Sequence, residues 1–96
     1  MKTKHTSGKW RFDAKHGAIC EGEAYSHFCK TLIARVNVDM GEESEANAKL
    51  IAAAPELLTT LQWIVNEIEN TPKQLQDALL GIIKIKAEQA IRKTEN

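Results

Sequence analysis

The second half of the chain has the spacing of amphipathic helices. Its large apolar residues recur at intervals of three and four, and the clearest series is Leu57, Leu61, Ile64 and Ile68. This spacing places apolar side chains on one face of an α-helix. It predicts a long helix from Pro55 to about Glu69. A shorter helix, from about Glu43 to Ala53, precedes it after an acidic lead-in that suits the positive end of a helix dipole.

A third helix is predicted from Pro72 to about Lys93. The segment Asn70–Pro72 stops one helix and starts the next, with Thr71 as N-cap and Pro72 at the first helical position. Because the connection is short, the two long helices should form an antiparallel hairpin. Pro55 interrupts the helical pattern earlier, and the sequence leaves open whether the chain breaks or only kinks there.

The first half alternates polar and apolar residues over short segments, which is typical of half-buried strands. Strands are predicted at 9–12, 18–21 and 31–38, and 25–29 is either strand or loop. Asp13–Gly17 is a predicted turn, with glycine available for positive φ. In the third strand, the side chains expected to face the core are Leu32, Ala34, Val36 and Val38. The loops are too short for parallel crossovers, so the strands should form an antiparallel meander of three to four strands.

These elements predict one α+β domain over residues 1–96, with a small N-terminal antiparallel meander, a short helix and a long helical hairpin. Residues 1–8 are expected to be a flexible N-terminus, 9–40 the sheet and 43–94 the helices, with breaks at Pro55 and at Asn70–Pro72. Apolar residues make up 43% of the chain and charged residues 27%, an ordinary globular mixture.

Charge and hydropathy limit the partners and the location that we expect for this protein. The formal net charge is zero, which disfavours nucleic-acid binding through bulk positive charge. No apolar run approaches the roughly 18 residues that span a bilayer, and no apolar segment of a secretory signal follows the first residues. We therefore expect a protein without a membrane partner, located in the cytoplasm of the cell that makes it.

The last predicted helix is apolar on more than one side, which exceeds what a single partner helix hides. A dimer or larger homo-oligomer would cover this surface. The expected self-association residues are Leu79, Leu80, Ile82, Ile83 and Ala87. The alternative is that the sheet covers them within one chain. Gly81, inside this helix, suggests the close approach of another helix.

Cys20 and Cys29 are the two cysteines of the chain. Reduced thiols that pack as small apolar side chains are the default expectation for a cytosolic protein. The two could also face each other across a hairpin, which spacing alone does not establish. His16, Cys20, His27 and Cys29 offer the ligand types of a zinc site, but their spacing is poor. We keep zinc as a weak alternative and expect no metal.

No motif for catalysis stands out: there is no Gly-rich phosphate loop, nucleophile elbow or metalloprotease helix. We therefore expect a protein that is not an enzyme and needs no cofactor, in which any pocket forms between subunits. The candidate residues for contacting a ligand or partner are Trp10, Arg35, Asn37, Asn47 and Trp63. Trp10, between two basic residues, suits stacking on a base beside a phosphate, although packing on the sheet is the commoner role.

Two segments together resemble a large family of small tailed-phage and prophage proteins. His5-Thr6-Ser7-Gly8-Lys9-Trp10 is similar to the family's opening motif, His-Thr-x-Gly-x-Trp. Residues 45–58 match its motif Glu-Ala-Asn-Ala-x-Leu-Ile-Ala-Ala-Ala-Pro-x-Leu-Leu almost letter for letter. Lys9 departs from the family, which usually has proline there. The resemblance extends from residue 5 to about 65 and transfers no catalytic residue.

The resemblance implies a phage or prophage accessory protein that acts by binding in the bacterial cytoplasm. Our first hypothesis is inhibition of a host anti-phage defence protein, such as a CRISPR effector. The alternative is a sponge that sequesters a cyclic nucleotide immune signal between subunits, as in the phage proteins that block Thoeris defence. A small DNA-binding regulator is the third hypothesis.

Overall fold

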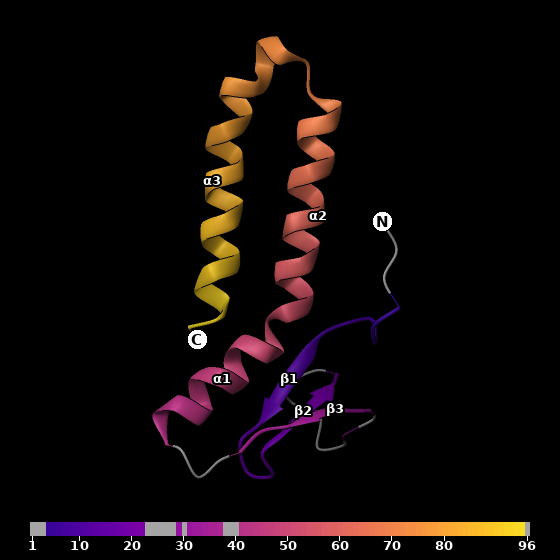
Figure 1. Ribbon diagram of the computed structural model, residues 1–96, viewed down its shortest axis with the longest axis vertical. Coiled ribbons are helices and arrows are strands. Elements are labelled where there is room, and N and C mark those ends of the chain that lie inside the picture. Colours follow the sequence, from indigo (N-terminus) through magenta and orange to yellow (C-terminus); the bar gives the residue numbers. More distant parts are fainter. Residues whose placement is uncertain (1–3, 23–28, 30, 38–40, 96) are drawn as a thin grey trace.

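Three antiparallel strands followed by helices make up the computed structural model, which describes residues 4–22, 29, 31–37 and 41–95 (Figure 1). The prediction of an α+β fold is therefore confirmed. The elements in chain order are β1 (Trp10–Asp13), β2 (Ala18–Glu21), β3 (Leu32–Arg35), α1 (Glu42–Ala52), α2 (Ala54–Asn70), a 3₁₀ turn η1 (Lys73–Leu75) and α3 (Gln76–Lys93). The expected additional strand at 25–29 lies almost entirely outside the described residues, as does Val38.

A tight turn joins β1 and β2 as the sequence predicts. Gly17 has φ of 62°, a conformation that glycine adopts without steric cost. The Asp13 side chain supports the turn, because its Oδ1 accepts a hydrogen bond from the backbone N–H of Lys15 at 3.1 Å. Its Oδ2 lies 2.7 Å from Nδ1 of His16. This pairing with His16 lowers the pKa of Asp13 below its ordinary value of 3.8.

The central strand β2 carries the best-buried part of the sheet. Ile19 and Cys20 are fully buried, and Ala18 is nearly so. Cys20 forms a disulfide with Cys29, with the two Cα atoms 5.4 Å apart. The expectation of reduced thiols is therefore wrong for this structure, because the connection after β2 brings Cys29 back beside the strand. The disulfide closes the loop between β2 and β3.

The expected core face of the third strand is wrong at Leu32, whose side chain is 47% exposed. β3 is an edge strand that pairs only with β2 in the described sheet, in the order β1-β2-β3. An irregularity between Ile19 and Cys20 shifts its register, so that Cys20 is opposite Leu32 and Ile19 is opposite Ala34. Helix α1 packs mainly on β1 and β2 and leaves Leu32 uncovered.

Helices α1 and α2 are two separate helices that meet at Ala53. The helical hydrogen bonds continue through the corner, since the Ala53 N–H donates to the Lys49 carbonyl and the Leu57 N–H donates to the Ala53 carbonyl, both at 3.0 Å. Pro55 lies in the first turn of α2, where its missing N–H breaks no helical bond. Figure 1 shows that the chain changes direction at this point.

The start of the last helix differs from the prediction. Thr71 does not cap it, and Pro72 precedes the 3₁₀ turn η1 rather than the first α-helical turn. The amide of Gln76 instead donates to the Thr71 carbonyl at 3.3 Å. Thr71 is extended, with ψ of 126°, so α2 ends there. The 3₁₀ turn η1 then precedes the first α-helical turn of α3.

The hairpin of α2 and α3 projects beyond the sheet, which lies at one end of it (Figure 1). The described chain measures 51 × 27 × 20 Å, and its radius of gyration is 16.1 Å. A domain of this size that packed around one core would have a radius of gyration of about 13 Å. As a result α2 has no fully buried residue among those described. Eight large apolar side chains of the hairpin region are more than 40% exposed: Leu61, Val65, Ile68, Leu75, Leu80, Ile82, Ile85 and Ile91.

We predict that breaking the disulfide lowers the free energy of unfolding by about 2–3 kcal/mol, since it releases a short loop in the unfolded chain. Urea unfolding of the wild type with and without dithiothreitol measures the effect. The Cys20→Ala/Cys29→Ser double variant is the control, because reductant should not alter its unfolding. Two titratable thiols in unreduced protein would contradict the prediction.

The pKa of Asp13 provides a second test of the turn. We expect it to lie below 3.8 in the wild type and to rise toward 3.8 in His16→Ala, which removes the hydrogen-bond donor. The stabilisation from this pairing is complete above the unfolded pKa and is lost as the pH falls through the lower, folded pKa. Carboxyl chemical shifts followed by NMR over this range measure both values. An Asp13 titration identical in the two proteins would contradict the assignment.

Candidate ligand-binding groove

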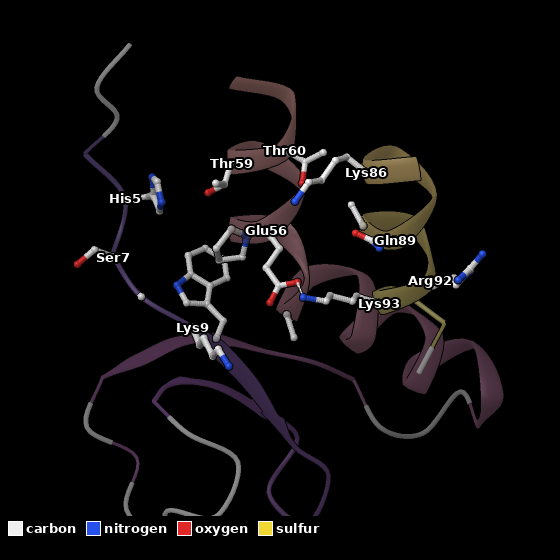
Figure 2. A pocket seen from close by; sticks show the side chains of 15 residues that line it. His5, Ser7, Lys9, Glu56, Thr59, Thr60, Lys86, Gln89, Arg92 and Lys93 are labelled. Carbon is white, nitrogen blue, oxygen red and sulfur yellow. Dashed lines mark ion pairs between the residues drawn. The ribbon is translucent and has the colours of Figure 1, made fainter. Parts of the chain in front are cut away.

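A groove of about 930 Å³ lies between the N-terminal segment and the base of the helical hairpin (Figure 2). This volume falls within the range of small-molecule sites, roughly 300–1,000 Å³. We call it the basic groove. Its lining residues are His5, Ser7, Gly8, Lys9 and Trp10 from the N-terminal segment, and Ala52, Pro55, Glu56, Thr59, Thr60, Lys86, Gln89, Ala90, Arg92 and Lys93 from the helices.

Residues 5–10, which we call the strap, form one wall of the basic groove. The indole N–H of Trp10 donates to the Thr6 carbonyl at 3.1 Å, which closes the strap on itself. The His5 ring meets the edge of the Trp10 ring, with centroids 6.2 Å apart and an angle of 75° between the planes. Gly8 has φ of 90°, so it supplies the reversal that brings Thr6 back to the indole. The His-Thr-x-Gly-x-Trp motif therefore describes a folded strap.

The helical wall begins at the corner between α1 and α2. Small residues there, Ala52 and Pro55, line the groove and leave room for the Trp10 ring of the strap. Ala48, one turn earlier on α1, is fully buried, and α1 packs on β1. The alanine-rich second motif therefore forms the part of the helical wall that meets the strap.

Basic side chains outnumber acidic ones around the groove. Among the described lining residues there are four lysines or arginines and one carboxylate, that of Glu56. Lys93 Nζ lies 2.8 Å from Oε2 of Glu56, so α3 and α2 are joined by an ion pair inside the groove. Lys86 extends toward Thr60 in Figure 2, and its ammonium lies 5.8 Å from the centroid of the Trp63 ring.

Arg92 contributes less to the groove interior than the lysines do. It points away from Glu56 and the strap in Figure 2 and lies 3.9 Å from the Glu88 carboxylate on its own helix. A smaller cavity of about 350 Å³ borders the groove and shares Trp10, Ala52, Glu56 and Lys93 with it. The indole of Trp10 thus borders both hollows, and the groove offers an aromatic surface beside ammonium groups and one carboxylate.

The structure assembles only part of the predicted set of binding residues. Trp10 lines the groove. Trp63 lies outside the lining, but its ring is close to the ammonium group of Lys86, which lines the groove. Arg35 and Asn37 are exposed at the end of β3, outside the groove lining. Asn47 is exposed on α1 and also lies outside the lining.

Sequence reasoning missed most of the groove. None of its residues in α2 and α3 was among the predicted binding residues, and residues 1–8 were expected to be a flexible N-terminus. The spacing of Lys86, Gln89 and Lys93, three and four residues apart, is the one signal that could have placed them on a common face. The expectation of a pocket between subunits differs from the structure, which forms the groove within one chain.

The predicted self-association residues fall on different sides of α3. Leu79 is buried, and Ile83 and Ala87 are half-buried. Leu80 and Ile82 are 60% and 51% exposed. Gly81 has open space around it, because a β-carbon added there would meet no atom of another element within 4 Å. No helix in the described part of the chain therefore approaches Gly81 closely.

The weak zinc alternative is not assembled among the described residues. Cys20 and Cys29 are joined as a disulfide, and a disulfide sulfur is not the thiolate that zinc binds. His16 is paired with Asp13, and His27 lies outside the described residues. In the described ranges, no group of three or more histidine, cysteine or acidic residues has the arrangement of a metal site.

The fold and the groove define a small α+β protein with a basic, aromatic-bordered site sized for a small molecule. The chain belongs to the family described as Salmonella phage P22 protein Y8K6, whose model matches residues 1–96. This confirms the inferred origin in a small phage protein family. No curated protein and no solved structure matches the chain. In the part of the chain that the structure describes, no helix has both the length and the hydropathy needed to cross a bilayer.

Two glycines provide a matched test of the strap. Gly8→Ala should destabilise the strap by about 1–2 kcal/mol, because alanine resists positive φ. Gly81→Ala should instead stabilise the protein by about 1 kcal/mol, since it improves helix propensity where space is open. Urea unfolding measures both, and hydrogen exchange of the Trp10 indole N–H reports on the strap. Unchanged indole exchange in Gly8→Ala would contradict this role.

Proposed function

We propose that this protein is a phage accessory protein that acts by binding a nucleotide in the basic groove. The observation that carries the proposal is the meeting of an aromatic ring, Trp10, with the ammonium groups of Lys86 and Lys93 around one ligand-sized volume. Nucleotides combine a planar base, which stacks on aromatic rings, with phosphates, which lysine side chains bind. The groove offers both kinds of contact.

The remaining groups of the groove suit the sugar and the base. The Glu56 carboxylate accepts hydrogen bonds from hydroxyl or amino groups, and the Thr60 hydroxyl and Gln89 amide both donate and accept. The ion pair between Glu56 and Lys93, at 2.8 Å, holds both charges in place before a ligand arrives. Holding them in place lowers the entropy lost on binding.

The phage family supplies the biological context for this binding. A phage protein that holds a nucleotide withholds it from the host, which is the sequestering role inferred as an alternative from the sequence. Direct inhibition of a host defence protein, our first hypothesis, stays a prediction, as does regulation through DNA. Action without catalysis is part of the proposal: the groove binds and does not transform its ligand.

Isothermal titration calorimetry with a defined panel tests the proposal. The panel contains inorganic phosphate, AMP, ATP, cyclic AMP and a cyclic dinucleotide. We expect at least one nucleotide to bind, and inorganic phosphate to bind more weakly than that nucleotide because it lacks the base. No binding by any nucleotide at low ionic strength would overturn the proposal.

A pair of lysine variants locates the site. Lys86→Ala should weaken nucleotide binding by about tenfold or more, since a charge-assisted contact contributes about 1.5–3 kcal/mol. Lys84→Ala is the matched control, because Lys84 is on the same helix, has a 79% exposed side chain and lies outside the groove lining. Equal losses in both variants would show non-specific charge attraction and contradict the assignment to the groove.

A further inference from the structure

We propose that two copies of this chain pair through one flank of the helical hairpin and form a four-helix bundle. The flank consists of Leu61, Val65 and Ile68 from α2 with Leu80 and Ile91 from α3, and we call it the apolar flank. All five side chains are 44–61% exposed. The inference does not depend on nucleotide binding.

Helical spacing places the apolar flank on the side opposite the basic groove. Leu61, Val65 and Ile68 are four and three residues apart, so they form one row along α2. Thr59 lines the groove, and Leu61, two residues later, lies about 160° around the helix from it. The same offset separates Gln89, in the groove, from Ile91 in α3. The residues that line the groove therefore lie on the opposite side of each helix from the apolar flank, while the exposed Ile82 and Ile85 lie on the groove side of α3, outside the lining.

The single chain buries few large apolar side chains. Of the seven buried hydrophobic residues among those described, four are alanines, and only Ile19 and Leu79 are large aliphatic residues. The sheet lies at one end of the hairpin (Figure 1), and the five side chains of the apolar flank are all exposed. Lone chains of this size depend on their core for stability, and a surface this apolar promotes association.

A second copy is the occupant that this small core favours. The flank needs cover whenever the chain folds, and a second copy is the one partner whose amount always matches that of the chain. The face of two helices is about 25 Å long and about 20 Å wide. This is a projected area of about 500 Å², and the side chains that stand out from it bring the surface available for burial closer to the roughly 800 Å² per partner of a standard interface. In a helical bundle, neighbouring helices interdigitate rows of side chains that are spaced three and four residues apart, as Leu61, Val65 and Ile68 are.

The pairing leaves the basic grooves free. Since the apolar flank and the groove are on opposite sides of the hairpin, a two-fold dimer carries one groove on each outer side. The bound stoichiometry is then two ligands per dimer. This separation also allows the dimer and the ligand site to be tested independently.

Sedimentation equilibrium and melting measurements test the dimer on the full chain. We expect a particle of twice the 10.7 kDa chain mass and a melting temperature that rises with protein concentration, because dimer unfolding depends on mass action. A monomer whose melting temperature is independent of concentration would overturn the inference. So would a closed assembly of more than two copies.

A matched pair of variants locates the interface. Val65→Glu places a charge in the middle of the apolar flank and should shift the equilibrium to monomer, or to unfolded chain if the monomer is unstable. Ile85→Glu is the control, since Ile85 is 59% exposed on another side of α3 and should leave the dimer intact. Dissociation by Ile85→Glu with an intact Val65→Glu dimer would overturn the assignment. If nucleotide binding fails while this pattern holds, the proposed function is lost and the dimer stands.

Discussion

The hydrogen bond from the Trp10 indole to the Thr6 carbonyl holds the N-terminal segment against the start of the sheet. Trp10 begins β1, so the sheet fixes its position, and the bond turns the preceding residues into a folded strap. The ring then faces the corner between α1 and α2, where Ala52 is small enough to admit it. An indole in a half-buried position needs a partner for its N–H, and the strap supplies one within four residues. The groove and the smaller cavity beside it share this one side chain.

A second constraint is the mismatch between a sheet of four-residue strands and helices of 17 and 18 residues. The sheet reaches only one end of the hairpin, so the other end has to be stabilised by contacts between α2 and α3 alone. Those contacts bury Leu79 but leave the outward rows exposed. On one side, the base of the hairpin lines the groove with lysines of α3, and the apolar flank lies on the opposite side. Because the sheet covers neither side completely, both stay accessible.

Local patterns in the sequence predicted the elements well and their tertiary environment poorly. The three-and-four spacing from Leu57 to Ile68 indicated α2, and the glycine at position 17 indicated the first turn. The alternation from Leu32 to Val36 did not predict the exposure of Leu32, because exposure at an edge strand depends on where α1 packs. Residues 5–8 looked flexible because the fold of the strap depends on Gly8 and Trp10 together, and neither is part of a periodic pattern. The disulfide needs the return of the chain after β2, which spacing alone does not determine. The groove unites residues from opposite ends of the chain, and no pattern within a single segment records this.

The walls of the groove also determine when a nascent chain can acquire it. The strap is synthesised before the sheet and the helices α1 and α2, and Lys86 and Lys93 are synthesised after them. Closing so long a loop carries an entropic cost that local contacts do not repay until the intervening elements have folded. The groove is therefore complete only after α3 has emerged from the ribosomal exit tunnel.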